Sequence, residues 1–409
     1  MRTIILASLL AAIPSATQAA PLTFDAAVAR AAREAPSIRA GEAGVEAKRA
    51  AATAAGQLPD PTLSVSIDDF PVSGPPAFSL SRDSMTVERI GIEQAFPNPA
   101  KRRAQRTRAL ADTGLALGEL ALETQTVRLE TALAWIDLYF AKRRLAQLDR
   151  LTVSLNDLQA TVAARLASGS ARPTQVLEPA QLRAAVTDRR SELAAEAARA
   201  RARLARFTGD PQADVAGSPP PLTVDRADLV TGLASHPRLE GLDARIRSAE
   251  AETGLARADK RPDFRVNASF GRRDPAYGDL VSVGVSIDLP LFARRRQDPK
   301  IAARAAEETQ AKLLLIAAER ELSAGLEGDL ADHDMHMQRL ENARKVLVPL
   351  AKHRAELDMA SYAAGKVDLG SALLSSLALA EAEVDALARE AEVARDAVQI
   401  VYTYGGAQP

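Results

Sequence analysis

The sequence of 409 residues contains no cysteine. This absence excludes a disulfide framework, a thiolate metal site and an acylated cysteine that would anchor a lipoprotein. Aromatic residues are also scarce, at 4% of the chain, whereas hydrophobic residues make up 47%. A composition rich in alanine and leucine but poor in aromatic residues is typical of long helices. We therefore expect a mainly α-helical protein with a small β part.

The chain has almost no net charge. It carries 52 basic and 53 acidic residues, which gives a formal net charge of −1. Neither nucleic acid nor an anionic membrane surface is therefore favoured as a partner, since both attract strongly basic proteins. The charges alternate in sign along the chain, as is typical of solvated helix faces.

Long apolar runs are missing as well. The run from Ile4 to Ile13 is about half the length of a membrane-spanning helix, and no later stretch reaches about 20 uncharged apolar residues. Residues 1–19 have the three parts of a secretory signal: a basic start at Arg2, this apolar run, and a small-residue exit that ends at Ala19. We therefore expect residues 1–19 to be a signal peptide and the remaining chain to be exported.

One stretch predicts a very long helix. Asn98 is a favoured N-cap residue, Pro99 suits the first helical position, and no other proline follows before Pro173. A helix over residues 99–168 would extend roughly 100 Å. Its distal half has the apolar spacing of a coiled coil, which requires a partner helix. We expect the chain to turn at Gly169 and return antiparallel over residues 174–207. The seam residues are Leu148, Leu151, Leu155, Leu158 and Val162.

Short alternating segments precede this helix. A first helix is predicted from Phe24 to about Gln57, and strands are predicted over residues 62–69 and 85–96, where apolar and polar residues alternate. Since an isolated two-stranded hairpin is only marginally stable in water, these strands must join a larger sheet.

The pattern occurs twice. Pro36 and Pro237 lie 201 positions apart in similar contexts, as do Pro61 and Pro262. The second half predicts strands over 263–271 and 280–289, a long helix over 298–364 that begins at Asp298-Pro299, and a return helix over 369–404. A linker over 209–222 separates repeats 20–208 and 223–409. Each repeat thus reads strand, strand, long helix and return helix.

Four strands of about ten residues match tilted strands that cross a bilayer, but at least eight are needed to close a barrel. A membrane location therefore requires several chains to pool their strands. The alternative is a soluble coiled-coil protein with small sheet caps.

These features together resemble the outer-membrane efflux channel (TolC) family. The resemblance rests on the duplicated layout and on the segments 58–61, 94–97 with 101–103, 167–169, 288–292 and 363–365. Residues 69–74, 83–86 and 94–97 resemble the heavy-metal efflux branch. The family implies a homotrimer with a 12-stranded β-barrel in the outer membrane, continuous with a periplasmic α-helical coiled-coil tunnel. Its partners would be outer-membrane lipid, a periplasmic adaptor (membrane fusion) protein and an inner-membrane RND pump.

The resemblance also suggests functional positions. The two tips, with Gly169 and Arg172 in the first repeat and Gly365 and Asp368 in the second, would dock the adaptor, although the glycines also suit simple turns. Aspartates that constrict the family's pore are replaced here by Gln175 and Ser371, so the pore constriction is not assigned. A lipid-facing strand is predicted from four alternating residues, Val281, Val283, Val285 and Ile287.

One histidine- and methionine-rich segment offers candidate metal ligands: His333, Met335, His336 and Met337. Imidazole and thioether groups suit soft or borderline cations. The alternative is packing, because His333 and Met337 fit the apolar seam of the helix. The sequence contains no evident nucleophile, acid pair or phosphate loop, so we expect no enzyme and no cofactor.

The predicted function is a passive exit duct for heavy-metal cations in a tripartite efflux system. Drug efflux and type I secretion by the same fold are alternatives. A rival from another class is a soluble periplasmic adaptor or scaffold, which would carry one hairpin and a lipoyl-like β-domain instead of two hairpins and four strands.

Overall fold

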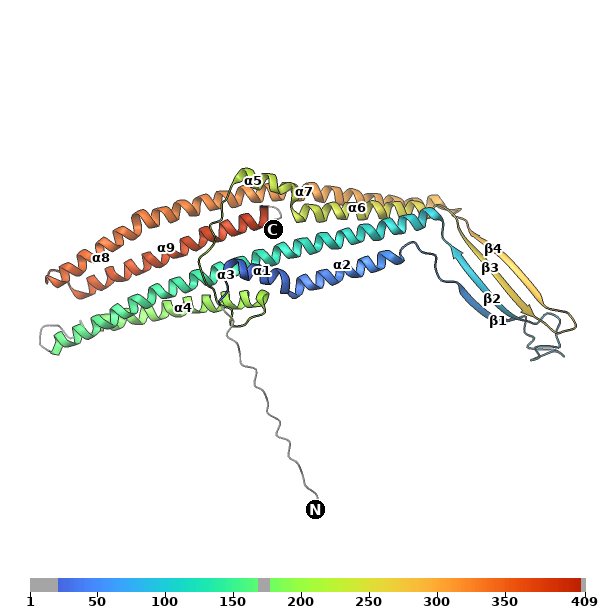
Figure 1. Cartoon of the computed structure of the whole chain (residues 1–409), viewed down its shortest axis with the longest axis horizontal. Helices are drawn as coiled ribbons and strands as arrows, with labels where there is room; N and C mark the ends of the chain where they lie inside the picture. The colour runs from blue at the N-terminus through green and yellow to red at the C-terminus, as the bar shows by residue number, and fades with distance from the viewer. Residues whose placement is uncertain (1–20, 168–176, 406–409) are drawn as a thin grey trace, which may run out of the picture. The chain divides into compact units, whose positions relative to one another are not determined.

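The computed structural model describes residues 21–167 and 177–405, so the expected signal peptide lies outside the described residues. The protein is mainly helical and has one four-stranded sheet (Figure 1). Two compact units divide the chain. Unit 1 contains residues up to 36, 125–229 and 326–405, and unit 2 contains residues 37–124 and 230–325. Each unit draws on both halves of the sequence, and the duplication itself stays a prediction.

The elements have the following bounds. The helices are α1 (Phe24–Glu34), α2 (Pro36–Ala54), α3 (Pro99–Ala167), α4 (Leu177–Thr208), α5 (Arg226–Gly232), α6 (Pro237–Ala258), α7 (Ala293–Asn342), α8 (Val348–Ala363) and α9 (Leu369–Tyr404). The strands are β1 (Thr62–Asp68), β2 (Val87–Phe96), β3 (Asp263–Arg272) and β4 (Leu280–Asp288). Within the part of the chain that the structure describes, no helix combines the length and apolar character needed to cross a membrane.

The first helix is shorter than expected. A single helix to about Gln57 was predicted, but the chain forms α1 and α2 with a break at Ala35, whose ψ of 128° is extended. The cause is Pro36, because a proline ring disfavours helical backbone in the preceding residue. Thr23 caps α1 by accepting a hydrogen bond from the Ala26 amide at 3.3 Å.

The start of α3 agrees with the sequence prediction. The Asn98 side chain accepts a hydrogen bond from the Lys101 amide at 2.8 Å, which is N-cap geometry, and Pro99 follows as the first helical residue. The same side chain donates to the Asp263 carboxylate at 2.9 Å and to the carbonyl of Ala258 at 3.3 Å. One buried asparagine thus ties the β2–α3 junction to the α6–β3 junction within unit 2.

The predicted start of the second long helix was wrong. Helix α7 begins at Ala293, not at Asp298, and Pro299 lies inside its second turn. The first turn of α7 forms before Asp298. The amides of Arg295 and Arg296 donate hydrogen bonds to the Phe292 carbonyl at 3.0 and 3.1 Å. Pro299 is past the first turn and has no amide to donate to the carbonyl four residues back, so the helix continues through it with one intrahelical bond missing.

A five-residue π-helical segment, Ala343–Leu347, separates α7 from α8. Here the Val348 amide donates to the Ala343 carbonyl, one residue further back than in an α-helix. Pro349 follows and has no amide to donate, so the wider turn lies where regular α-helical bonding is interrupted.

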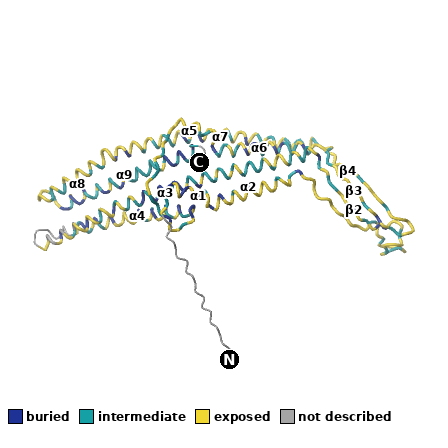
Figure 2. Tube along the Cα trace, viewed as in Figure 1, coloured by how far each residue is buried: buried dark blue, intermediate teal, exposed yellow. Residues whose placement is uncertain are grey.

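The core of unit 1 surrounds Trp135, the only tryptophan in the sequence. Its ring packs edge to face on Phe24, with centroids 5.5 Å apart, and its indole N–H donates to the Leu22 carbonyl at 2.8 Å. Leu22 also forms a parallel bridge with Val215 in the linker. The start of the described chain and the linker are therefore held by the same core, where buried residues gather along α1, α3 and α4 (Figure 2).

In unit 1, helices α3 and α4 pack together with α8 and α9. Buried residues of α3 and α4 form one cluster with residues of α9, and Tyr362 of α8 packs against it. This is the antiparallel coiled-coil contact that the apolar spacing predicted, except that the side chain of Leu158 lies outside the described residues. The buried members are Leu155, Val162, Leu182, Val186, Leu369 and Leu373.

The strands form one antiparallel sheet in the order β1-β2-β3-β4. Their bounds lie within two residues of the predicted ones. The sheet belongs to unit 2, where α3 and α6 also approach closely. A Cβ added at Gly118 would lie 2.8 Å from the Cα of Gly241, so this contact requires glycine.

Candidate functional site

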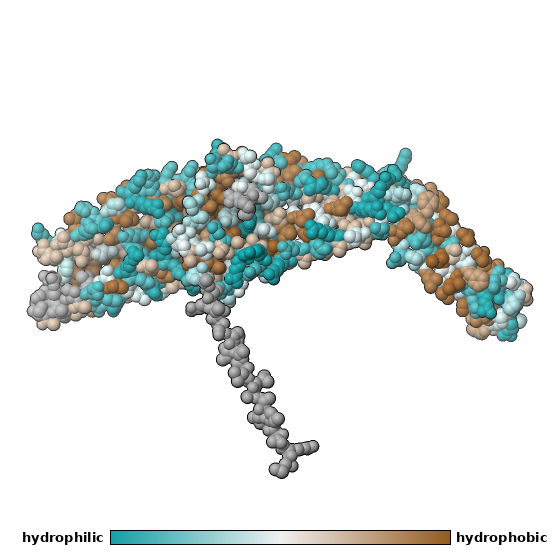
Figure 3. Space-filling view, in the orientation of Figure 1, coloured by the Kyte–Doolittle hydropathy of each residue, from teal (hydrophilic) through white to brown (hydrophobic). Residues whose placement is uncertain are grey.

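One face of the sheet is apolar and exposed on all four strands. The predicted lipid-facing residues of β4 are between 49% and 77% exposed. Neighbouring strands continue the same face, as the hydrophobic side chains over the strands in Figure 3 illustrate. The face consists of Leu63, Val65, Ile67, Ile90, Ile92, Phe264, Val266, Phe270, Val281, Val283, Val285 and Ile287.

The strand register keeps these residues together. Val65 lies opposite Ile90, Ile90 lies opposite Phe270, and Phe270 lies opposite Val281. Since side chains alternate between the two faces of a strand, a shift by one residue would turn the apolar set to the other face. The register therefore fixes a continuous apolar surface that no described part of the chain covers.

The opposite face is polar and is bridged by Arg89 of β2. Its guanidinium donates to the Asp68 carboxylate of β1 at 2.6 Å, to the hydroxyl of Ser269 on β3 at 3.1 Å, and to that of Ser282 on β4 at 3.4 Å. One side chain thus links all four strands. Sequence alternation predicted this polar face but gave no signal for the bridging role of Arg89.

Both edges of the sheet are open among the described residues, because β1 and β4 each pair on one side only. An exposed edge presents unpaired backbone amides and carbonyls, and such edges do not occur in lipid. A sheet with one apolar face and two open edges is thus suited to pair with further strands.

The second tip has the geometry of a Schellman C-cap. Gly365 has a φ of +71°, its amide donates to the Tyr362 carbonyl, and the Lys366 amide donates to the Ser361 carbonyl, both at 2.9 Å. The space beside Gly365 is open, since a Cβ there would meet no atom within 4 Å. The left-handed backbone, and not crowding, therefore favours glycine at this position.

Of the other residues predicted at the tips, the structure describes two and leaves three outside the described residues. Asp368 is the exposed N-cap residue of α9, and Ser371 is exposed in the first turn of that helix. Gly169, Arg172 and Gln175 lie outside the described residues.

The candidate metal ligands on α7 are divided between two environments. Met335 and Met337 are exposed, at 40% and 47%, whereas His333 and His336 are turned toward α9. The expected packing of Met337 in the apolar seam was therefore wrong. As the side chains stand, the described residues contain no group of three or more histidine, cysteine or carboxylate ligands arranged to hold a metal ion.

The partners of these histidines were missed in the sequence. Asp396 on α9 accepts or shares a hydrogen bond with His336 at 2.7 Å, and Glu392 lies 3.9 Å from the other ring nitrogen. Burial raises the pKa of Asp396, but its hydrogen bonds to His333 and His336 outweigh this effect and hold the pKa below its usual range. The spacing of four residues between Glu392 and Asp396 places both on one helix face, which is the only sequence signal for the pair.

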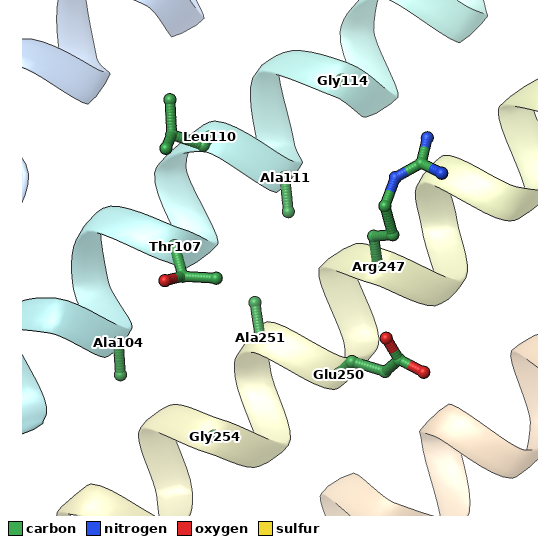
Figure 4. A pocket seen from close by; sticks show the side chains of 9 residues that line it. All are labelled: Ala104, Thr107, Leu110, Ala111, Gly114, Arg247, Glu250, Ala251 and Gly254. Atoms are coloured by element: carbon green, nitrogen blue, oxygen red, sulfur yellow. The ribbon is translucent and has the colours of Figure 1, made fainter.

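A groove of about 510 Å³ lies between α3 and α6 in unit 2 (Figure 4). Small residues such as Ala111, Gly114 and Gly254 line most of it, with Arg247 and Glu250 on one side. Thr107 is the only hydroxyl residue in this lining, and Glu250 is its only carboxylate.

No protein-family model matches the sequence, and no curated protein matches it. Solved structures do. A membrane protein of Pseudomonas aeruginosa matches with a TM-score of 0.79 at 17% identity, covering 94% of this chain and 90% of that one. The Campylobacter jejuni outer-membrane channel CmeC matches with a TM-score of 0.77 at 12% identity, covering 94% and 85%. The outer-membrane protein VceC of Vibrio cholerae matches with a TM-score of 0.75 at 17% identity, covering 94% and 96%.

The chain has the TolC-like outer-membrane channel fold. The family resemblance seen in the sequence is confirmed at this level, because these matches span nearly the whole described chain. Because the sequence identities are only 12–17%, these matches show the fold and nothing further.

Proposed function

We propose that the chain is the outer-membrane channel component of a tripartite efflux system and acts as a passive exit duct. The observation that carries this proposal is the apolar face, which is exposed on all four strands and backed by a polar face. Strands β2, β3 and β4, with nine or ten residues each, have the length of tilted strands that cross a bilayer, and β1 is shorter, with seven. The protein would lie in the outer membrane of a Gram-negative cell with its helices in the periplasm.

The open edges of the sheet support a homotrimer. Four strands cannot close, whereas three copies supply the 12 strands of a barrel in which every edge is paired. The helices of the three chains would continue as a periplasmic tunnel. The partners of the assembly are a periplasmic adaptor and an inner-membrane RND pump, and the duct itself catalyses no reaction.

Heavy-metal cations are the proposed cargo. This assignment is supported by the resemblance of residues 69–74, 83–86 and 94–97 to the heavy-metal efflux branch. Drugs and secreted proteins are the alternative cargoes. A passive duct takes its specificity largely from its pump, so the cargo is tested in cells. If the pump exports metal cations, loss of the duct closes their exit route and should make the host more sensitive to metal cations. Sensitivity to drugs alone would transfer the proposal to the drug-efflux alternative.

Cell fractionation tests the location. The full chain should be recovered with the outer membrane on a density gradient and should crosslink as a trimer. A soluble periplasmic protein expressed in the same cells serves as the control for leakage. Recovery of the chain with that control protein would support the coiled-coil adaptor and remove the channel from consideration.

A further inference from the structure

A short apolar segment connects β4 to α7 in unit 2 (Figure 1). Leu289, Leu291 and Phe292 are 61%, 76% and 69% exposed. The chain turns around Pro290, since the Leu291 amide donates to the Leu289 carbonyl at 2.9 Å. Large apolar side chains that lie exposed this close together mark a surface that binds a protein or a membrane.

The segment continues the apolar face of the sheet. Ile287 is exposed on that face at the end of β4, and Leu289 follows two residues later. In the strand register Ile287 lies opposite Phe264, and Phe264 lies opposite Phe96, where both rings are exposed. This row crosses the end of the sheet that leads into α3 and α7. Aromatic residues at the margin of an apolar band are typical of the boundary between lipid and water.

Three consecutive arginines follow the apolar segment. Arg294, Arg295 and Arg296 are exposed in the first turn of α7, and that turn contains no acidic residue. Their side chains form no ion pair with any residue that the structure describes. Three adjacent positive charges without a partner repel one another, so an anionic partner would stabilise them.

The nearest carboxylates are engaged elsewhere. Arg296 borders a recess of about 180 Å³ together with Asp259, Asp263 and Asp288. Each of these aspartates, and Asp298 of α7, lies within 2.6–3.1 Å of a different cation. The pairs are Asp259 and Asp263 with Lys101, Asp288 with Arg265, and Asp298 with Lys260. The charge of the three arginines is therefore not neutralised within the described chain.

We propose that residues 289–296 bind the headgroups of anionic phospholipids. This inference rests on the proposed outer-membrane channel, in which the helical end of the sheet faces the periplasm. Phe292 and the two leucines would lie beneath the headgroups, and the guanidinium groups would bind lipid phosphate oxygens, whose geometry matches the planar guanidinium. The net charge of −1 disfavoured an anionic membrane as a partner of the whole chain, but it does not reveal a local excess of positive charge.

The arginines should select among lipids. A basic residue close to an anionic membrane surface strengthens the attraction about fivefold, and salt screens part of this effect. Three arginines should therefore enrich anionic lipid beside this segment by about tenfold over a zwitterionic lipid. The apolar side chains alone would give no such preference, because the acyl chains of the two lipids are alike.

Fluorescence quenching by brominated lipids tests the proposal. Phe292→Trp places a reporter in the segment, and Trp135, the only tryptophan of the sequence, is fully buried and gives a constant background. The full chain is reconstituted into vesicles of equal parts phosphatidylglycerol and phosphatidylcholine, with bromine on one lipid at a time. We expect brominated phosphatidylglycerol to quench the reporter more strongly, by an amount that corresponds to the tenfold enrichment.

Three variants in the Phe292→Trp background serve as controls. Replacing Arg294, Arg295 and Arg296 by glutamine should abolish the preference for phosphatidylglycerol, whereas replacing them by lysine should keep most of it. The matched control replaces three other exposed arginines by glutamine and removes the same charge, so the preference should be unchanged. These arginines are Arg39, Arg199 and Arg245.

Equal quenching by the two lipids in the Phe292→Trp protein would overturn the proposal, as would a preference that persists in the glutamine variant. Loss of the trimer in the glutamine variant alone would also overturn it, since the arginines would then bind a neighbouring copy. Fractionation separates this inference from the channel. A crosslinked trimer in the outer membrane without a lipid preference refutes the lipid site alone, whereas recovery in the soluble periplasm refutes both.

Discussion

At the scale of single residues, Asp214 of the linker binds Lys142 of α3 within unit 1. Its two carboxylate oxygens each lie 2.8 Å from the ammonium group of Lys142, and one accepts a hydrogen bond from the Val215 amide at 3.0 Å. Burial raises the pKa of Asp214, but the bonds to Lys142 and Val215 outweigh this effect and lower the pKa. The ionised carboxylate is therefore favoured in the folded protein.

The lowered pKa of Asp214 makes the free energy of unfolding depend on pH. A lowered folded-state pKa stabilises the protein above the ordinary aspartate pKa of about 3.9, and the stabilisation is lost as pH falls through the lowered value. Because the Asp214 side chain is 35% exposed, water screens the pair and we expect less than about 1 kcal/mol. Denaturant unfolding at pH 7 and pH 3 should show a smaller difference for Asp214→Asn than for the unchanged protein. Asp60→Asn, at an exposed position, is the control and should show the full difference.

At the scale of elements, the apolar and polar faces of the sheet should respond differently to the substitution of a single arginine. Val283 of β4 lies on the apolar face opposite Ala268 of β3. Asn267, which precedes Ala268 in β3, lies on the polar face opposite Glu93 of β2. Both positions are near the middle of their strands and at a similar level of the sheet. An arginine at position 283 would face lipid, whereas one at position 267 would face a carboxylate.

The proposed membrane face predicts different costs for these two changes. Val283→Arg should destabilise the folded channel by about 2–4 kcal/mol if the position is near the bilayer midplane. Asn267→Arg should be tolerated, since opposite charges across a strand pair are mildly stabilising. Ser282→Arg is a poorer control because Arg89 already lies 3.4 Å from that hydroxyl. The measurement is the yield of folded protein in the outer membrane, and equal yields for both variants would contradict the assigned face.

The elements also show what sequence patterns determine. Alternation of apolar and polar residues located all four strands, although it is less clean in β2, and Asn98-Pro99 located the start of α3, because both signals are local. Asp298-Pro299 gave a wrong start for α7, because in the sequence a proline in an early helical turn resembles one at the first helical position. Arg89 and the acidic partners of the histidines were missed because their contacts join segments far apart in sequence.

At the scale of the whole molecule, we propose that the tips dock the adaptor and that the rest of the chain serves folding. The turn at Gly365 belongs to the C-cap of α8, while the neighbouring packing comes from the buried cluster of Leu155, Leu369 and others. A change at Gly365 leaves those buried residues in place. Since the space beside the glycine is open, a large side chain there would project outward. Docking and folding can therefore be separated at this one position.

Gly365→Trp should leave a trimer of normal abundance in the outer membrane and abolish metal resistance and crosslinking to the adaptor. Left-handed backbone costs roughly 1–2 kcal/mol for a residue with a side chain, which is small beside the burial of a trimer. Gly365→Asn is the matched control, because asparagine tolerates left-handed backbone and adds little bulk, so it should keep resistance. Loss of the trimer in the tryptophan variant alone would mean that the glycine serves folding. Normal resistance with an intact trimer would place the docking surface away from this turn, since a bulky ring cannot occupy a tightly packed contact without weakening it.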